Sequence, residues 1–310
     1  MIYFNEKIFL LGLEATYGTI PALAASDAIL ATDIRIMPME GQDQSRNLER
    51  PHMGAQATIP VDLHAKMSFK VELTPSGVAG TAPVVGKLLR ALGCAETVTA
   101  TTSVVYNPVS RNHESVGVHL WIGDTRFALI GARGTGVLRI NASGIPVLEV
   151  ELTGLWTAPT EAARIEPDLD DQLEADVLVA TTANTPVFTV NAVGLVMRSF
   201  ALTLGNKVEP RFLIGAERVL ITGREEMVET TVEAVPLSVL DPFGLALARS
   251  RVAVALTHGT QAGKTVSLAI PAAQVQRQQG IEEQQGIAEW PLRLVPQPGA
   301  GNDQWTLSFT

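Results

Sequence analysis

Alternation of apolar and polar residues with a period of two runs through most of the chain and constrains its fold more than any other feature. Apolar residues occupy every second position in Ser68–Leu73, and Val147–Leu152, Ser199–Leu204 and Gln304–Thr310 repeat the pattern. A strand of this kind buries one face and leaves the other in water, which is typical of antiparallel sheets. The sequence therefore predicts a mainly β fold, an antiparallel β-sandwich or partial barrel.

Helix signals are few and predict one flanking helix in each half of the chain. Pro83–Gly93 places Val85, Leu88, Leu89 and Leu92 at helical spacing, with proline near the start and glycine at the end. In the second half, Asp241 precedes Pro242 and can cap a helix that runs towards Arg249. Each helix is expected to lie against a sheet.

A segment rich in carboxylates divides the chain. Seven acidic residues fall between Glu161 and Asp176, and such a run is usually a solvated linker. We therefore expect a β domain over residues 1–160, an acidic linker over 161–185, and a second β region over 186–310. The second region either completes or repeats the first, since Ser68–Leu73 is similar to Ser199–Leu204 and Val137–Ala142 to Val266–Ile270. Duplication and chance similarity both remain open.

One long polar segment, Glu40–Gln56, lies between two strand-like runs, Ala31–Met37 and Thr58–Leu63. A loop of this length inside a compact domain is usually functional or disordered. It contains two arginines, Arg46 and Arg50, among acidic and amide side chains.

Composition excludes several classes of protein. The net charge of −9 gives no basic surplus with which to neutralise phosphates, and aromatic residues at 5% are too few for a base-stacking or sugar-stacking surface. One cysteine, Cys94, allows no intramolecular disulfide. The N-terminus does not read as a signal peptide, and the longest apolar runs are shorter than a membrane span. We expect a protein made in the cytoplasm.

A search for catalytic, cofactor-binding and metal-binding residues finds none. Gly259–Thr265 ends in Gly-Lys-Thr, but it has three residues between its glycines where a phosphate loop has four, and a strand follows it. Gly131–Gly136 is interpreted as a turn between strands. The five histidines have no paired metal-binding spacing. The prediction is a non-enzymatic protein without cofactors.

The chain resembles the tail tube proteins, or major tail proteins, of long-tailed phages and prophages. The matching segments follow one another in order over residues 14–160: Glu14–Pro21, the polar loop Gly41–Gly54, Phe69–Leu73, the Gly80–Gly93 helix region, Val105–Ser110, Leu129–Thr135 and Gly144–Gly154. Near the end, Gly286–Leu292 and Asn302–Leu307 fit the way such chains close.

This resemblance implies a structural virion protein with a β-sandwich of the tail-tube type. Its subunits form rings, usually of six, which stack helically into a hollow conduit for DNA ejection, and strands of every subunit join into one barrel round the lumen. The implied partners are further copies of the chain and the tail terminator, tape measure and tail-tip proteins, while DNA passes without specific binding. At 310 residues the chain either carries extra structure or duplicates the fold, with three chains then making a six-unit ring.

Two sets of site residues follow. The polar loop is expected to stack ring on ring through Gln42, Asp43, Arg46, Glu49 and Arg50. Glutamates on the wet strand faces are expected to face the lumen: Glu72, Glu149 and Glu151 first, then Glu229 and Glu233. The alternative function is an all-β adhesin or receptor-binding module of a tail, which would need an exposed aromatic platform.

Overall fold

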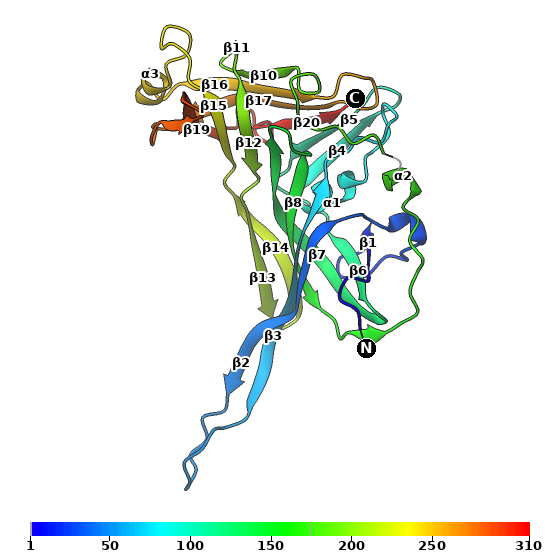
Figure 1. The fold of residues 1–310 in the computed structure, drawn as a ribbon. Helices are drawn as coiled ribbons and strands as arrows, with labels where there is room; N and C mark the ends of the chain where they lie inside the picture. Colours follow the sequence, from blue (N-terminus) through cyan, green and yellow to red (C-terminus); the bar gives the residue numbers. More distant parts are fainter. Residues whose placement is uncertain (1, 174) are drawn as a thin grey trace.

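The computed structural model describes residues 2–173 and 175–310 and shows a mainly β protein (Figure 1). The strands of the first half are β1 Lys7–Leu13, β2 Thr32–Ser45, β3 Thr58–Glu72, β4 Cys94–Thr99, β5 Ser103–Pro108, β6 Val116–Ile122, β7 Thr125–Asn141, β8 Val147–Trp156 and β9 Thr160–Glu161. Those of the second half are β10 Val187–Val190, β11 Val193–Gly194, β12 Met197–Thr203, β13 Asn206–Leu213, β14 Ala216–Arg224, β15 Met227–Glu233, β16 Arg251–His258, β17 Val266–Val275, β18 Glu282–Gln284, β19 Ile287–Pro296 and β20 Thr306–Phe309. The helices are η1 Ala25–Asp27, α1 Val85–Ala91, α2 Asp170–Leu173 and α3 Pro242–Leu247.

A main sheet runs through both halves in the order β2-β3-β8-β7-β12-β15-β19, with every pair antiparallel. Strand β7 joins the halves because its residues 137–141 pair with β12 on one edge while β8 occupies the other edge. The N-terminal part of β7 pairs with β6, which pairs with β1. The steep strands of this sheet are seen in the centre of Figure 1.

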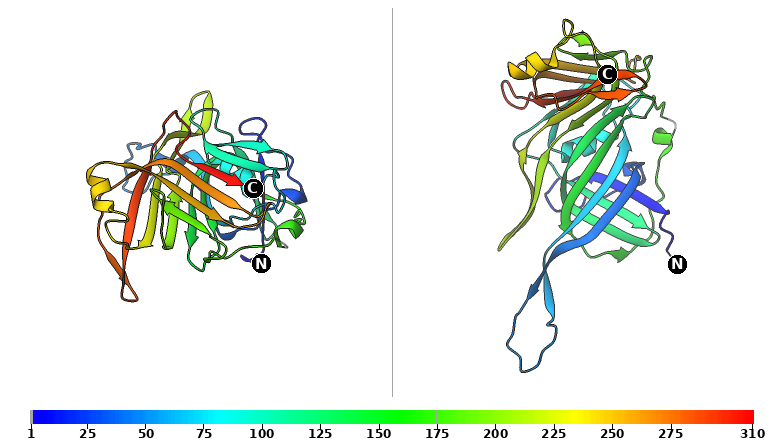
Figure 2. Two further views of the ribbon diagram at one scale, coloured as in Figure 1. Left: turned by 90° about the horizontal axis from the view of Figure 1, so that it is seen from above. Right: turned by 60° about the vertical axis from the view of Figure 1, so that its left-hand side comes forward.

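A second layer lies across one end of the main sheet, at the top in Figure 1 and in the right-hand view of Figure 2. It has the order β10-β16-β17-β20-β5-β4, and β17 also pairs with β19 of the main sheet. The two layers form a β-sandwich without a closed barrel. The predicted fold class is confirmed, and each half carries one of the two expected helices, α1 and α3.

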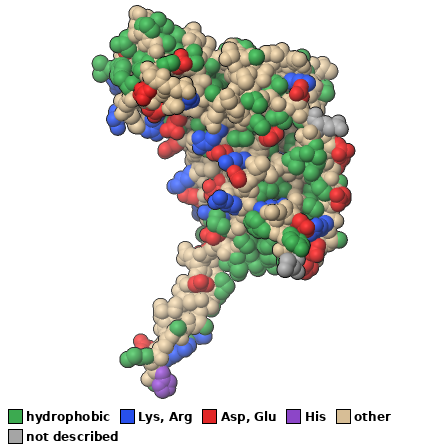
Figure 3. All heavy atoms as spheres, in the orientation of Figure 1, with side chains coloured by type: hydrophobic (Ala, Val, Ile, Leu, Met, Phe, Trp, Pro, Cys, Tyr) green, Lys and Arg blue, Asp and Glu red, His purple; other side chains and the backbone are tan. Residues whose placement is uncertain are grey.

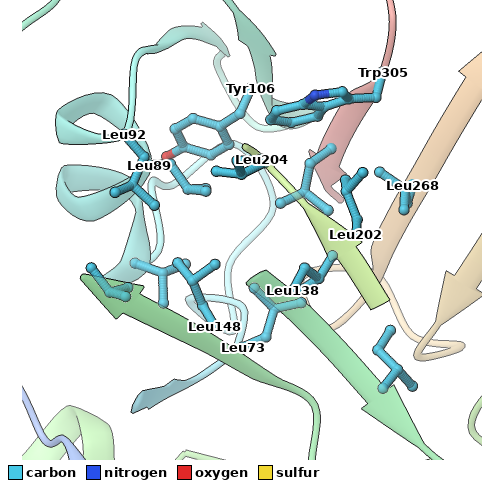
Figure 4. Close-up of a cluster of buried hydrophobic side chains, with 14 of the residues drawn as sticks. Leu73, Leu89, Leu92, Tyr106, Leu138, Leu148, Leu202, Leu204, Leu268 and Trp305 are labelled. Carbon is cyan, nitrogen blue, oxygen red and sulfur yellow. The ribbon is translucent and has the colours of Figure 1, made fainter. Parts of the chain in front are cut away.

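One hydrophobic core is shared by the two halves. Leu138 and Leu148 of the first half pack near Leu202, Leu204 and Leu268 of the second, beside α1 and the Trp305 ring (Figure 4). All of these side chains are at least 96% buried. Burying one leucine fully stabilises a fold by roughly 1.5–3 kcal/mol, so neither half is expected to keep its stability without the other.

The predicted helices form for the expected local reasons. In α1 the apolar residues Val85, Leu88 and Leu89 are buried, as the helical spacing requires. In α3 the Asp241 carboxylate accepts hydrogen bonds from the Phe243 and Gly244 amides, and Pro242 occupies the first helical position.

The same strand order occurs twice in the chain. The first half pairs its strands as β2-β3-β8-β7-β6-β1, and the second as β12-β15-β19-β17-β16-β10. A short last strand, β9 or β20, then adds to the start of β7 or β17. Only one of the two segment similarities noted in the sequence falls on counterpart strands. Val137–Ala142 lies at the end of β7 and Val266–Ile270 at the start of its counterpart β17, whereas Ser68–Leu73 and Ser199–Leu204 belong to β3 and β12, which are not counterparts.

Three further segments differ from their sequence interpretation. Gly131–Gly136 is not a turn between strands but a bulged part of the single strand β7, with Gly131 at φ +58°. Residues 40–45 are the end of β2 rather than loop. Between Ala162 and Leu173 the acidic segment packs along β1 and β6, where the Trp121 indole donates to the Ala162 carbonyl.

The division of the chain into domains at 161–185 stays a prediction. Of the acidic cluster in that segment, Glu174 lies outside the described residues.

Candidate assembly surfaces

The main sheet has one face turned away from the core, here called the open face, and it carries the five glutamates expected to face a lumen. Directly opposed residues of an antiparallel sheet lie on the same side. Glu149 is opposite Val137, Val137 is opposite Thr203, and Thr203 is opposite Met227, two residues from Glu229. Alternation along β3, β8 and β15 places Glu72, Glu151 and Glu233 on that side too.

Charges on the open face are mixed. Glu149 lies 3.7 Å from Lys70 and 2.7 Å from Arg139, and Glu229 lies 3.1 Å from Arg293. Among the described residues, no ion pair involves Glu72, Glu151 or Glu233. The basic residues Arg35 and Lys66 lie on the same face and, within the described residues, also have no ion-pair partner, so the open face carries unpaired charges of both signs.

At the β19 end of the open face, the Arg198 side chain covers the nearly buried carboxylate of Glu289. Glu289 of β19 is 2% exposed, opposite Glu233, and its Oε2 atom accepts a hydrogen bond of 2.7 Å from Arg198 Nε. The Arg198 guanidinium holds the pKa of Glu289 below its ordinary value. Arg198 stands in the bulge of β12, which turns its side chain towards β19.

The ends of β2 and β3 form a long hairpin, here called the arm, that projects from the body (Figures 1 and 2). Of the predicted stacking residues, Gln42 and Asp43 lie in β2 and pair with Val61 and Pro60, whereas Arg46, Glu49 and Arg50 lie in the tip that follows. The Gln56 side chain closes the tip by hydrogen bonds of 2.8 Å to the Leu48 amide and carbonyl.

Most residues of the arm are exposed, and the face of the arm seen in Figure 3 carries apolar as well as charged side chains. Met39, Met53 and Ile59 are at least half exposed, and Met53 is fully exposed. Gly41 allows the two strands to approach, because a Cβ atom there would lie 2.6 Å from the Val61 carbonyl oxygen. An exposed hairpin with this composition is suited to docking on another protein surface.

A second, shorter hairpin was not predicted from the sequence. Within the described residues, strands β13 and β14 pair only with each other, and they end at a tip where Ile214 is fully exposed. Arg133 anchors the hairpin to the body by donating to the Val219 carbonyl at 2.7 Å, while the Tyr17 hydroxyl accepts from the Val219 amide at 2.6 Å. The paired glycines Gly205 and Gly215, which begin and turn the hairpin, were the available sequence signal.

The two hairpins occupy equivalent places in the repeated strand order. The arm extends β2 and β3, and the short hairpin extends β12 and β15. Figure 1 shows both of them pointing to the same end of the molecule, opposite the second layer. Each chain therefore presents two projections of unequal length at one end.

Nothing in residues 2–173 and 175–310 suggests a catalytic or metal centre. Those residues include no group of three or more His, Cys, Asp or Glu side chains placed to hold a metal ion. Residues 259–265 form the connection between β16 and β17, as expected for a hairpin turn and not for a phosphate loop. Within the described chain, no helix has the length and hydrophobicity needed to cross a membrane.

Comparison with known protein families identifies the kind of protein that carries these surfaces. A family model described as phage tail tube protein matches residues 5–291, nearly the whole chain. The chain belongs to the phage tail tube family. No curated protein matches it.

Family membership confirms the function predicted from the sequence. The protein is a structural, non-enzymatic subunit of the phage tail tube and a component of the virion tail. It assembles with copies of itself and with other tail proteins. Nothing favours the adhesin alternative.

Proposed function

We propose that three chains close into one ring of the tail tube and that each chain contributes two similar sheet units. The repeated strand order carries this proposal, because it gives every chain two sheets of the same topology joined edge to edge through β7 and β12. Three such chains supply the six units that the sequence resemblance implies for a ring. The main sheet offers eight strands per chain to the barrel: β2, β3, β8, β7, β12, β15, β19 and β18.

The open face of the main sheet is the proposed wall of the lumen. Its other face is buried against α1 and the second layer, so only the open face remains to line a water-filled channel. Glu72, Glu151 and Glu233 repel phosphates there. Of the basic residues on this face, Lys70, Arg139 and Arg293 are engaged with carboxylates, whereas Arg35 and Lys66 are not within one described chain. DNA then passes without the counterion release that drives phosphate binding.

The arm is the proposed contact between stacked rings. Arg46 and Arg50 at its tip are suited to charge-assisted hydrogen bonds with carboxylates of the next ring, and the exposed methionines adapt to an irregular surface. At the two ends of the tube the same surfaces are proposed to meet the tail terminator and the tail-tip proteins. The tape measure protein is the proposed occupant of the lumen before DNA.

Mass photometry and negative-stain microscopy of the concentrated protein test this function together. We expect rings with the mass of three chains and six peripheral lobes, and stacked tubes at higher concentration. Rings of six chains would contradict the proposal that each chain contributes two units. A protein that stays monomeric at every concentration would contradict the proposal that the isolated chain forms tubes.

A further inference from the structure

Two strand edges in the repeated sheet lack a partner, and they stand at its opposite ends. Within the described residues, β2 pairs only with β3, and β18 pairs only with β19. All three residues of β18 are exposed, and so are Ile281 just before it, at 64%, and Met37 of β2, at 47%. Open strand edges are templates for pairing with another chain.

The chain already contains one junction of the kind that would join these edges. Where the two units meet, β12 pairs with the end of β7 in the antiparallel register Ser199–Asn141, Ala201–Arg139 and Thr203–Val137. Strand β12 is the counterpart of β2, and β18 continues β17, the counterpart of β7. A second copy of the chain can therefore pair its β2 with β18 in the same way that β12 pairs with β7 inside one chain.

Equivalent positions are aligned by matching buried residues of the counterpart strands. The alignment sets Leu148, Val150 and Leu152 of β8 against Trp290, Leu292 and Leu294 of β19. Val147, opposite Arg139, then corresponds to Glu289, opposite Glu282, so Arg139 corresponds to Glu282.

The same comparison aligns the outer strands. Met67, Phe69 and Val71 of β3 correspond to the buried Val228, Thr230 and Val232 of β15. Through the pairing of β2 with β3 and of β12 with β15, Ile36, opposite Met67, corresponds to Leu202, opposite Val228. Arg35 is thus the counterpart of Ala201, the residue that faces Arg139.

We infer that β2 of one subunit pairs antiparallel with β18 of the next, with Arg35 opposite Glu282 and Ile36 opposite Ile281. The inference rests on the proposed ring and names the strands that close it. Arg35 and Glu282 are both exposed and, within the described residues, neither has an ion-pair partner, so the register brings opposite charges together. It also places the exposed Ile281 against another isoleucine.

The proposed pairing of β2 with β18 also ends at the same place as the internal pairing of β12 with β7. Leu204, the counterpart of Pro38, donates its amide to the Gly136 carbonyl, the last bond of the internal junction. Pro38 has no amide proton, so pairing of β2 with a neighbour ends there, where the arm begins. The contact is heterologous, joining different edges of identical chains, and such contacts generate rings when the rotation closes.

Hydrogen bonding in the internal junction also predicts which side chains come closest. Leu204 and Arg198 bond β7 through their backbone groups, so alternate residues such as Phe200 and Leu202 do the same. Ala201 and Arg139, and by analogy Arg35 and Glu282, then form a pair without backbone hydrogen bonds, in which Cα atoms are about 4.5 Å apart. That spacing lies within the range a disulfide can bridge.

Disulfide trapping in assembled tubes tests the register. Arg35→Cys with Glu282→Cys should give covalent trimers under mild oxidation, whereas Arg35→Cys with Gln284→Cys, two residues away on the same face, should give at least about tenfold less. The native Cys94 does not interfere, because it is buried and burial raises its pKa to about 12. Tubes in which the offset pair links better than the matched pair would overturn the register while leaving the tube function intact.

A charge exchange covers the case in which the cysteine variants do not assemble. Arg35→Glu and Glu282→Arg should each raise the protein concentration needed for ring formation by about three- to tenfold, since like charges or lost pairs then face each other. The double exchange should restore assembly. A double exchange no better than either single one would also overturn the inference, whereas wild-type protein that forms no rings would instead count against the proposed function.

Discussion

Arg133 shows how one side chain can hold an element that the main sheet does not. Its guanidinium donates to three backbone carbonyls, those of Val219 at 2.7 Å, His113 at 2.6 Å and Glu114 at 3.1 Å, and it stacks 4.9 Å from the Tyr17 ring centre. These bonds join the short hairpin, the loop before β6 and the N-terminal segment. In the part of the chain that the structure describes, the short hairpin makes no strand pairing with the body, so it depends on such contacts.

Replacing Arg133 by methionine should destabilise the protein by roughly 2–4 kcal/mol, because three carbonyls lose their donor and half-buried polar groups are left unpaired. Arg218→Met, at an exposed position of β14, is the matched control and should change stability by less than about 0.5 kcal/mol. Urea denaturation followed by fluorescence measures both. Equal effects of the two substitutions would mean that Arg133 does not anchor the hairpin.

His119 makes stability depend on pH. Burial, and to a lesser extent the nearby Arg126 charge, lower the pKa of His119 to about 4, and its ring packs edge-on against Trp121. The unfolded state therefore binds a proton more readily than the folded state between about pH 6.5 and 4, so the free energy of unfolding falls as pH falls through this range.

His119→Gln should reduce this dependence, with wild type losing roughly 2 kcal/mol more than the variant between about pH 7 and pH 4.5. His52→Gln in the exposed arm is the control and should follow the wild-type profile. Chemical denaturation at a series of pH values gives the comparison. Parallel profiles for wild type and His119→Gln would show that His119 is not the group responsible.

At the scale of elements, the strands that pack on the core and the helices α1 and α3 could be predicted, because burial of one face imposes a simple period. Phe69, Val71 and Leu73 are all buried as their alternation indicated, and Asp241 caps α3 as expected. Such local patterns do not indicate where a strand extends beyond the hydrophobic core into solvent. The polar end of β2 therefore read as loop, although backbone pairing with β3 extends it to Ser45.

The candidate surfaces could be predicted only in part. Register brings five glutamates from distant segments to one face, and alternation had placed each of them on the wet side of its strand. Their ion pairs with Lys70, Arg139 and Arg293 come from neighbouring strands, which single-strand patterns cannot indicate. The sequence left repetition of the first region open, but the strand order that shows it depends on which strands pair, and short segment similarities do not indicate that.

Removal of the arm tip tests its role in stacking. Deleting Gln42–Met53 should leave a folded protein that still forms single rings but no longer stacks, because the deletion removes the tip and spares the edge of β2 before Pro38. Arg46→Ala with Arg50→Ala should weaken stacking in the same direction, with exposed Arg111→Ala as the control. Mass photometry counts rings and microscopy counts tubes; long tubes from the deletion variant would contradict the assignment.

At the scale of the whole molecule, the net charge of −9 opposes association. Like-charged subunits repel each other, and ordering the exposed arm on a neighbour costs conformational entropy. Because both effects oppose association, we expect assembly only at high protein concentration or on an existing nucleus. Raising salt from about 50 mM to about 500 mM should screen the repulsion and speed polymerisation. Light scattering follows this; rapid polymerisation at micromolar protein in low salt would contradict it.

We propose that the open face of a twice-repeated sheet becomes the inner wall of the tube. A cryo-electron microscopy reconstruction of assembled tubes measures this directly. We expect rings with three-fold symmetry and six similar units, with Glu72, Glu151 and Glu233 on the lumen surface and the arms reaching the adjacent ring. A tube whose lumen is lined by other elements, with these three glutamates on its outer wall, would contradict it.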